Sequence, residues 1–253
     1  MPPERLQKII AGAGLASRRG AEELIATGAV YVNGARATIG DLADPETDEI
    51  QVHGRVVDAT LPHVYIALHK PPGYVTSLRS THGERTVTRL LPGDRRLFPV
   101  GRLDKETSGL LFVTDDGEWA NLVTHPRYRI VKEYRVLVRG RPDEQVLDRL
   151  RHGVRLPDGA VTAPADVRRI GDDRGNSWLS ISVIEGKKRQ IRLMAREVGY
   201  PVLALQRVRI GPIALGALPE GSWRDLTGPE VEELRDIARR RIARSGPRSG
   251  DPG

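Results

Sequence analysis

Residues 98–117 of this 253-residue chain read FPVGRLDKETSGLLFVTDDG. Within this stretch, Gly109–Thr114 is apolar and partly β-branched, a pattern that predicts a buried strand. Residues 115–117 predict a turn in which either aspartate would cap the helix that follows. Residues Arg102–Ser108 then form a loop held between two elements of the core, and catalytic groups are often carried on loops anchored in this way.

Asp104 is the side chain of this loop best suited to a catalytic role. It is flanked by Arg102 and Lys105, whose positive charges favour its ionised form. An ionised carboxylate beside a sugar acts as a nucleophile or stabilises an oxocarbenium ion. Local chemistry alone leaves a second interpretation open, in which Asp104 caps a turn and Arg102 is a surface charge.

Outward from the loop, the hydrophobic pattern indicates a strand-rich region with interspersed helices. The strands and helices do not alternate regularly enough for a doubly wound parallel sheet. We therefore expect an α+β fold, with a mixed, mostly antiparallel sheet flanked by helices. The predicted strands are Tyr65–His69, Gly109–Thr114, Glu133–Val138, Leu179–Ile184 and Val202–Ile210, and the predicted helices are Glu118–Thr124, Asp143–Arg151 and Arg189–Val198.

The first 58 residues have a different pattern, which reads helix, turn, helix and short strands. Leu6, Ile9 and Ile10 form the apolar stripe of the first helix. Ser17 is the predicted N-cap of the second helix. Asn33-Gly34 is a strong signal for a two-residue hairpin turn, and residues 53–54 are a weaker one.

These patterns predict three parts. We expect a small domain at residues 1–60, a larger domain at 61–230, and a last part at 231–253 made of a short helix and a tail. Residues 58–63 look like the linker between the two domains. The tail is rich in Gly and Pro and too polar to bury a core, so we expect it to be disordered.

The composition narrows the class of protein. The net charge of +7 and the pI of about 10.0 fit a polyanionic partner, although an ordinary basic surface fits them equally well. The absence of cysteine excludes disulfides, thiol nucleophiles and cysteine-ligated zinc. The histidines are scattered, so we expect no metal site. No signal-type region and no apolar run of membrane-spanning length is visible, and we expect a cytoplasmic protein.

The segment GRLDKETSGLLFVTDDG (101–117) resembles the signature loop of pseudouridine synthases, specifically the RsuA/RluB family. The pattern Arg-Leu-Asp-x-x-Thr-x-Gly-Leu-Leu is long and specific. Gly101 before it and residues 114–117 after it favour this family over its RluA relatives. The resemblance implies an enzyme that isomerises uridine to pseudouridine in RNA, with Asp104 as the catalytic residue.

Two further segments carry the same resemblance. KEYRV (132–136) is similar to the family's Lys-x-Tyr motif. This implies that the Tyr134 ring stacks on the target uracil and that its hydroxyl helps to remove the proton from carbon 5; a purely structural interpretation has Tyr134 as half-buried packing. EGKKRQIR (185–192) is similar to the Gln-Ile/Val-Arg motif, which implies that Arg192 pairs with Asp104. We expect Gly186 and Lys187 to open the helix that carries Arg192.

Basic residues surround these motifs. We expect Lys187, Lys188 and Arg189 to contact phosphates, and Arg102 to contact RNA or to hold the opened site. The alternative is a solvated basic face, and it is the preferred interpretation for Arg196 and Arg209.

The N-terminal part resembles the small α-L RNA-binding domain of some ribosomal proteins and tRNA synthetases. The similarity lies in residues 6–9, 16–19 and 28–34. It implies RNA contacts at the starts of the helices, where backbone N–H groups favour phosphate. The residues in question are Arg5, Lys8, Arg18 and Arg19.

The resemblance implies a specific uridine in ribosomal RNA as substrate, with large-subunit RNA preferred over small-subunit RNA. A base stacked in folded RNA has to be flipped into the pocket. The isomerisation needs no redox step, so we expect no cofactor. The substrate is either free RNA or a ribosomal assembly intermediate, and we expect a monomer. Whether Asp104 attacks the sugar or drives formation of a glycal stays open. The competing classes are a non-catalytic RNA-binding or ribosome-assembly protein, and a hydrolase using the same carboxylate.

Overall fold

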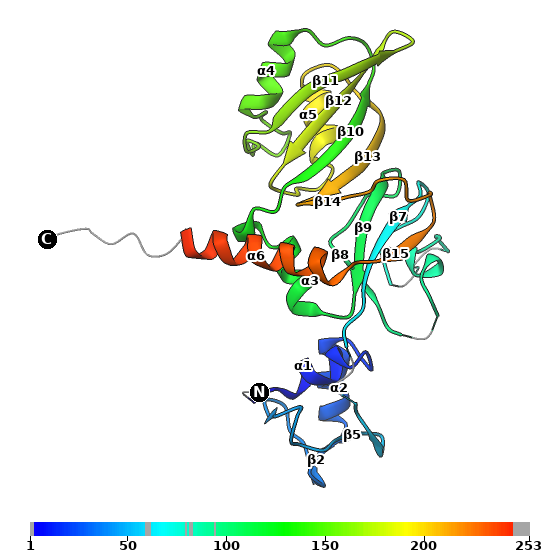
Figure 1. The fold of residues 1–253 in the computed structure, drawn as a ribbon, viewed down its shortest axis with the longest axis vertical. Helices are drawn as coiled ribbons and strands as arrows, with labels where there is room; N and C mark the ends of the chain where they lie inside the picture. The colour runs from blue at the N-terminus through cyan, green and yellow to red at the C-terminus, as the bar shows by residue number, and fades with distance from the viewer. Residues whose placement is uncertain (1–2, 59–61, 79, 81–82, 94, 245–253) are drawn as a thin grey trace, which may run out of the picture. The chain divides into compact units, whose positions relative to one another are not determined.

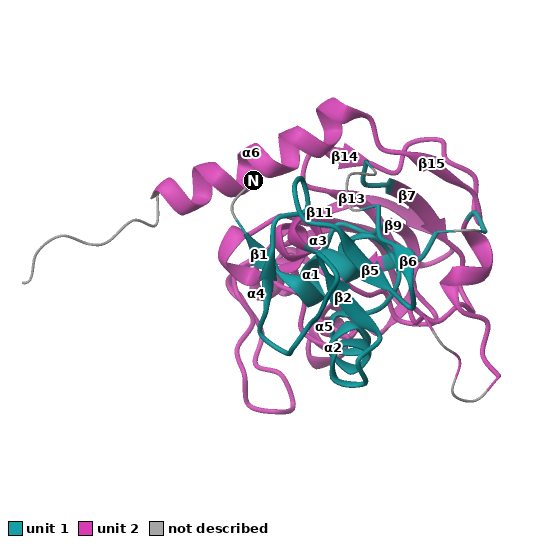
Figure 2. Ribbon diagram, turned by 90° about the horizontal axis from the view of Figure 1, so that it is seen from below, with its two compact units in different colours: residues 1–65, 92–98, 113–117 teal, residues 66–91, 99–112, 118–253 magenta. Residues whose placement is uncertain are grey.

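The computed structural model describes residues 3–58, 62–78, 80, 83–93 and 95–244. These residues form two compact units, drawn in teal and magenta in Figure 2. Unit 1 comprises residues 1–65, 92–98 and 113–117, and unit 2 comprises residues 66–91, 99–112 and 118–253. Residues 59–61 of the expected linker and the expected tail at 245–253 lie outside the described residues. The domain boundaries at residues 60 and 230 stay a prediction.

Unit 1 is built around a small apolar core formed by its helices and short strands. The antiparallel sheet has the strand order β3-β2-β5-β6, and β1 pairs separately with β4. The predicted stripe of Leu6, Ile9 and Ile10 is buried in this core, as expected. The elements are β1 (Glu4–Arg5), α1 (Leu6–Gly12), α2 (Arg18–Ala26), β2 (Val30–Val32), β3 (Ala35–Arg36), β4 (Leu42–Ala43), β5 (Ile50–Val52) and β6 (Arg55–Val56).

The local signals of unit 1 act as the sequence predicted. The hydroxyl of Ser17 accepts a hydrogen bond of 3.0 Å from a backbone N–H in the first turn of α2, and so caps this helix. The β2–β3 hairpin turns at Asn33 and Gly34, whose φ angles are 51° and 79°. Positive φ at both positions is what a two-residue hairpin turn of this kind requires, and Asn and Gly tolerate it best.

The aspartates that follow β9 (Ser108–Thr114) hold the chain at the start of β7 (Tyr65–Lys70). Asp115 accepts a hydrogen bond of 3.0 Å from the backbone N–H of Val64, and its carboxylate lies 3.0 Å from His63 Nδ1. The hydroxyl of Tyr65 donates to Asp116 at 2.7 Å. The capping role that the sequence predicted for either aspartate stays a prediction, and the structure shows that both aspartates fix residues 63–65.

Unit 2 is organised around a sheet of strand order β11-β12-β10-β13-β9-β7-β15, visible in Figure 1. β10 pairs antiparallel with β12 and with β13, whereas β13 and β9 pair in parallel. The predicted α+β fold with a mixed, mostly antiparallel sheet is therefore confirmed. The strands are β7 (Tyr65–Lys70), β8 (Phe98–Val100), β9 (Ser108–Thr114), β10 (Lys132–Val138), β11 (Asp166–Asp173), β12 (Asn176–Val183), β13 (Val202–Ile210), β14 (Ile213–Ala214) and β15 (Trp223–Asp225).

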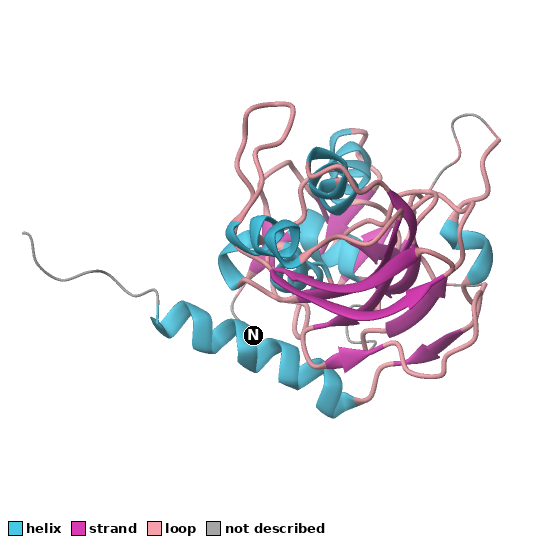
Figure 3. Cartoon of the chain, turned by 90° about the horizontal axis from the view of Figure 1, so that it is seen from above, coloured by secondary structure: helices cyan, strands magenta, loops and turns pink. Residues whose placement is uncertain are grey.

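Helices α4 (Glu144–His152) and α5 (Gln190–Glu197) cover one face of this sheet. Val136 of β10 and Leu179 of β12 stand opposite each other in the antiparallel register, so their side chains share that face. Leu147 of α4 and Met194 of α5 belong to the same buried cluster as these two side chains. Figure 3 shows the strands as a twisted layer with helices packed on it.

The helix that follows β9 and the C-terminal helix pack near β9. The indole N–H of Trp119 donates to the carbonyl of Val231 at 3.4 Å, and its ring centroid lies 5.4 Å from that of Phe112. Val231 and Leu234 are buried, so the C-terminal helix is part of this core and is longer than predicted. None of the described helices has the length and apolar character needed to cross a membrane. The elements are η1 (Val87–Leu90), α3 (Gly117–Thr124), η2 (Pro126–Tyr128) and α6 (Gly228–Arg244).

Two features of unit 2 differ from the prediction. Strand β11 was not predicted, because Val167 is its one buried residue and no alternating apolar face is visible. The prediction that Gly186 and Lys187 open α5 is wrong, since this helix begins at Gln190. The preceding residue, Arg189, has a φ angle of 54°, in the left-handed region that a right-handed helix cannot include.

Gly109 marks the closest approach of β9 to β13. Its φ angle is +110°, and a Cβ atom placed on it would lie 2.2 Å from the carbonyl oxygen of Arg207 and 2.6 Å from its nitrogen. Both neighbours are backbone atoms of a strand, so they cannot move without disturbing the sheet. We expect Gly109→Ala to lower the free energy of unfolding by more than about 2 kcal/mol, as measured by urea denaturation.

Gly171→Ala provides the matched control for this prediction. Nothing lies within 4 Å of a Cβ atom placed on Gly171, and its φ angle is not positive. We expect its free energy of unfolding to stay within about 0.5 kcal/mol of the native value. Equal unfolding midpoints for the two variants would show that the close approach at Gly109 does not affect the free energy of unfolding.

Candidate active site

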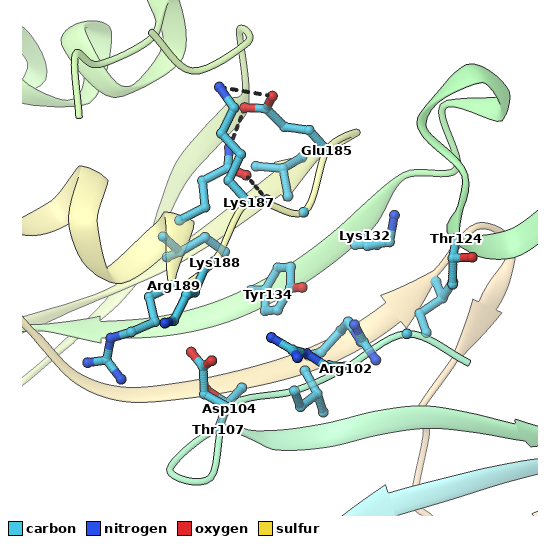
Figure 4. A pocket seen from close by; sticks show the side chains of 18 of the residues that line it. Arg102, Asp104, Thr107, Thr124, Lys132, Tyr134, Glu185, Lys187, Lys188 and Arg189 are labelled. Atoms are coloured by element: carbon cyan, nitrogen blue, oxygen red, sulfur yellow. Dashed lines mark hydrogen bonds and ion pairs between the residues drawn. The ribbon is translucent and has the colours of Figure 1, made fainter. Parts of the chain in front are cut away.

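A pocket of about 360 Å³ opens in unit 2 beside β10 and the loop that joins β8 to β9. Asp104 and Tyr134 both line it, and Figure 4 shows both side chains pointing into it. The volume is in the range of sites that bind small organic molecules. Basic groups outnumber acidic ones along the wall. The other ionisable side chains lining the pocket are Arg102, Lys132, Glu185, Lys187, Lys188, Arg189 and Arg207.

The loop that carries Asp104 is fixed on both sides of this residue. The hydroxyl of Thr76 donates to the carbonyl of Leu103 at 2.8 Å and accepts from its backbone N–H at 3.2 Å. The backbone N–H of Thr107 donates to the carbonyl of Asp104 at 3.0 Å and closes a turn. The loop is anchored as the sequence predicted, and its anchors hold the Asp104 backbone in one position.

Lys70 is a buried cation at the end of β7 that the sequence analysis did not single out. Its ammonium donates to the carbonyls of Pro71, Lys105 and Thr107 at 3.0, 3.2 and 2.8 Å. The last two belong to the loop of Asp104, so Lys70 ties this loop to the sheet. Burial lowers the pKa of Lys70 to about 8. The sequence signal for this residue was a lysine at the end of a mostly apolar strand, residues 65–70.

Tyr134 stands on the side of β10 that faces the pocket. Val136 and Val138 lie on the same face of the strand and are buried. Tyr134 itself is half-buried and packs against the edge of the core cluster formed with α4 and α5. Since the ring also lines the pocket, it offers a flat surface on which a planar base would stack.

Arg192 is close to the Asp104 loop but contacts its backbone. Its guanidinium donates to the carbonyl of Glu106 at 3.2 Å and lies 3.5 Å from Thr107 Oγ1. Within the part of the chain that the structure describes, no ion pair joins Arg192 to Asp104, so the expected direct pairing is absent. Burial and the charge of Arg189 lower the pKa of Arg192, while Asp104 acts in the opposite direction. Arg192 therefore supports the loop that presents the carboxylate.

The loop before α5 owes its shape to the buried side chain of Gln190. Its Oε1 accepts from the backbone N–H of Lys187 at 3.1 Å, and its Nε2 donates to Glu185 at 2.6 Å. Lys187 also donates to the carbonyl of Val161 at 2.9 Å. This arrangement places the basic run 187–189 in the pocket wall, where Figure 4 shows Lys187 reaching toward Glu185.

The structure places the predicted RNA-contacting residues of unit 2 together at the pocket. These residues are exposed to solvent and lie in the pocket wall, so they are suited to contact phosphate groups. The residues with both features are Arg102, Lys187, Lys188 and Arg189.

The predicted RNA-contacting residues of unit 1 lie at the helix starts, as the sequence indicated. Arg18 and Arg19 are exposed in the first turn of α2. Arg5 precedes α1 and donates to the carbonyl of Gly40 at 2.7 Å. Lys8 forms an ion pair of 2.8 Å with Glu4. Arg18 and Arg19 are therefore the more accessible cations of the set.

Two further cations of the pocket were missed as site residues. Lys132 is two residues before Tyr134 on β10, and Arg207 stands opposite Tyr134 in the β10–β13 ladder. Burial, followed by the nearby charge of Arg207, lowers the pKa of Lys132 to about 8. An arginine in the middle of the apolar strand at 202–210 was the signal that could have revealed Arg207.

The lowered pKa values of Lys70 and Lys132 predict a pH dependence of stability. Each pKa is about 8 in the folded state, against an ordinary 10.5. Between these values the unfolded chain binds more protons than the folded one, so the free energy of unfolding rises as pH is raised from about 8 to about 10.5. Urea denaturation across this interval measures the slope.

Lys132→Met isolates one of these contributions. Since the variant has no ammonium at position 132, we expect a shallower rise of the unfolding free energy over the same pH interval. A slope equal to that of the native protein would mean that Lys132 titrates at its ordinary value in the folded state.

Comparison with known proteins matches both units. Residues 64–197 match the RNA pseudouridylate synthase family, and residues 4–50 match the S4 domain. The chain is 41% identical over 238 residues to ribosomal large subunit pseudouridine synthase B of Bacillus subtilis, with 93% of this chain and 97% of that protein covered. It is 41% identical over 233 residues to an uncharacterized RNA pseudouridine synthase of Aquifex aeolicus, with 91% and 93% covered.

A solved structure is similar as well. The crystal structure of a pseudouridylate synthase superposes with a TM-score of 0.66 and 29% sequence identity, covering 91% of this chain and 99% of that one. These matches confirm the resemblances that the sequence motifs indicated, for the catalytic part and for the N-terminal part.

Proposed function

The chain belongs to the RNA pseudouridylate synthase family, and from this premise we propose that it converts a uridine of large-subunit ribosomal RNA to pseudouridine with Asp104 as its catalytic carboxylate. The observation that carries the proposal is the pocket that Asp104 and Tyr134 line together, with an excess of basic groups around them. A carboxylate, a stacking ring and phosphate-binding cations are the groups that this reaction requires.

Asp104 acts on the sugar. The bond between C1′ of the ribose and N1 of the uracil breaks, the ring turns, and a new bond forms between C1′ and C5. The carboxylate either adds to C1′ or drives formation of a glycal, and both routes return it unchanged. The backbone anchors from Thr76 and Lys70 hold the carboxylate in position, so little reorganisation is needed at the moment of reaction.

Tyr134 stacks on the uracil, and its hydroxyl helps to remove the proton from C5 after the new bond has formed. The half-buried ring in the pocket wall supports the first role. Arg192 acts through the loop: its hydrogen bonds to Glu106 and Thr107 orient the chain around Asp104. Arg102 contacts RNA or fills the space left by the base.

The target base reaches the pocket by flipping out of the RNA. A stacked uracil cannot meet a carboxylate on a recessed loop, and unstacking it costs a few kcal/mol, which phosphate contacts must offset. The exposed cations of the pocket rim and those at the start of α2 supply such contacts. We also propose that the chain divides into domains at residues 60 and 230. The N-terminal domain binds RNA in this proposal, which the S4 match of residues 4–50 supports.

The identity of the relatives favours ribosomal RNA as the substrate. The Bacillus subtilis relative is named as a pseudouridine synthase of the large ribosomal subunit, and the similarity extends over nearly all of both chains. We further propose that the enzyme is a monomer in the cytoplasm. Its substrate is free ribosomal RNA or a ribosomal assembly intermediate. Size-exclusion chromatography with light scattering tests the monomer.

The direct test uses ribosomal RNA that contains uridine labelled with tritium at C5. We expect the native chain to release tritium and to leave a pseudouridine at a defined position of the large-subunit RNA. Mapping of pseudouridines in cells that lack this chain identifies that position. No tritium release from either free RNA or assembly intermediates would refute the proposal, and an abasic site in the product would indicate a hydrolase instead.

A further inference from the structure

Arg207 is a buried cation with an unused donor. Its side chain is 3% exposed, and Nε donates to the carbonyl of Leu110 at 2.7 Å. Nη2 is buried as well and has no hydrogen-bond partner among the residues that the structure describes. Because an unpartnered donor on a buried charge costs a few kcal/mol, its retention calls for an acceptor that arrives from outside. Arg207 lines the pocket, so this acceptor is part of the ligand.

A register shift in the sheet brings Arg207 to the pocket. Glu133 is opposite Arg209 in the β10–β13 ladder, but Tyr134 is opposite Arg207, with a bulge between the two pairs. Residues directly opposite in an antiparallel pair project to the same face with Cβ atoms about 5 Å apart. The bulge therefore sets Arg207 on the same face of the sheet as Tyr134, and both residues line the pocket that would hold the uracil.

The charge around Arg207 points to an anionic ligand. The positive charges of Lys70 and Lys132 are close enough to interact with it, since Arg207 disfavours the charged form of both lysines. Such a group of buried cations needs a counter-charge. The exposed cations at 187–189 suit the phosphates of the RNA, whereas Lys132 and Arg207 line the pocket in which the base would lie.

We propose that Arg207 is a further catalytic residue, whose free Nη2 binds a carbonyl oxygen of the uracil and stabilises the negative charge of the base once it has left the ribose. The inference rests on the proposed function. When the C1′–N1 bond breaks, its electron pair stays on the uracil and spreads over N1 and the carbonyl oxygens. The later C1′–C5 bond uses an electron pair of the same anion, and the C5 proton is lost as N1 gains one. No oxidant or reductant is involved.

Lys132 assists from the same side of the sheet. Its ammonium is held by the carbonyl of Ile130 at 3.2 Å and lines the pocket. Both cations are fixed before the substrate binds. Preorganised donors of this kind act where charge develops, and the loss of one typically slows the reaction by about 10²–10³-fold.

The test is Arg207→Gln in single-turnover reactions with enzyme in saturating excess. We expect product formation on uridine-containing RNA to slow by about 10²-fold or more. RNA carrying 5-fluorouridine at the target position provides the second substrate, because fluorine lets the base leave more readily as an anion. Since C5 of this base carries fluorine and has no proton to lose, the reaction on this RNA is followed as the loss of 5-fluorouridine. We expect a clearly smaller loss on this RNA. Digestion and chromatography of the target nucleoside measure both rates.

Arg209→Gln is the matched control, since Arg209 is on the same strand but pairs with Glu133 outside the pocket. We expect its rates on both RNAs to stay near those of the native chain. Arg207→Lys keeps a cation, and we expect an intermediate rate. If Arg207→Gln lacks the native thermal transition, the comparison of the two RNAs is made with Arg207→Lys.

Equal slowing of Arg207→Gln on both RNAs would overturn the inference, because a merely structural residue would not distinguish the leaving groups. A native rate at saturation with weaker RNA binding would overturn it too. In both cases the native chain and Arg209→Gln remain active, so the proposed function survives. If these two also leave uridine unchanged, the proposed function fails and the role of Arg207 fails with it.

Discussion

Replacement of Asp104 by asparagine is expected to abolish pseudouridine formation, with a loss of at least about 10⁴-fold in single-turnover rate. The amide is close in size to the carboxylate but carries no charge, so it can neither add to C1′ nor drive glycal formation. Asp104 is only half-buried and its carbonyl, not its side chain, closes the loop turn with Thr107. The thermal transition is therefore expected to stay within a few degrees of the native one.

Tritium release from C5-labelled ribosomal RNA measures the loss. Glu106→Gln is the matched control, because it makes the same chemical change two residues away on the same loop, where the side chain is exposed. We expect this control to retain activity near the native level. Release by Asp104→Asn at the rate of Glu106→Gln would exclude Asp104 as the catalytic carboxylate and with it the proposed mechanism.

Lys70→Met is expected to lower the same rate by about 10²-fold, since a displacement of about 1 Å at the reacting group has an effect of that size. Methionine fills much of the volume but leaves the carbonyls of Pro71, Lys105 and Thr107 without their donor. The free energy of unfolding is expected to fall less sharply, because removal of a buried charge offsets part of the lost hydrogen bonding.

The pH dependence of the unfolding free energy shows whether the buried ammonium of Lys70 has been removed. Lys70→Met removes one of the groups with a pKa of about 8, so its unfolding free energy should rise less between pH of about 8 and about 10.5 than that of the native chain. Lys105→Met is the control: its carbonyl still accepts from Lys70, while its exposed side chain is changed. Equal activities for the two variants would show that the loop does not depend on Lys70.

Most of the fold follows from local patterns. The strand at 202–210 was predicted with its observed bounds, and Ser17 caps its helix through the expected hydroxyl. Such elements are encoded by near neighbours in sequence, either through alternating burial or through a cap. β11 escaped prediction because it pairs at the sheet edge through backbone atoms, and its exposed side chains show no period.

The candidate site shows the same division. Motifs identified Asp104 and Tyr134, and the structure places both in one pocket. The position of Arg192 was anticipated only in part, since it contacts the loop backbone and not the carboxylate. Lys70 and Arg207 were not identified: a cation within an apolar strand signals burial, but the local sequence does not tell which carbonyls or which pocket the side chain meets.

The sequence by itself therefore predicted the class of fold, most of its elements and the family, and it singled out Asp104 as the proposed carboxylate, because each depends on residues that are adjacent or at fixed spacing along the chain. Tertiary structure alone decided which cations lie near that carboxylate and that Nη2 of Arg207 has no partner among the described residues. A single bulge at Val208 of β13, between the pairs Glu133–Arg209 and Tyr134–Arg207, moves Arg207 to the pocket face. Since side chains alternate between the faces of a strand, a one-residue change in pairing decides where a charge points, and no local pattern encodes it.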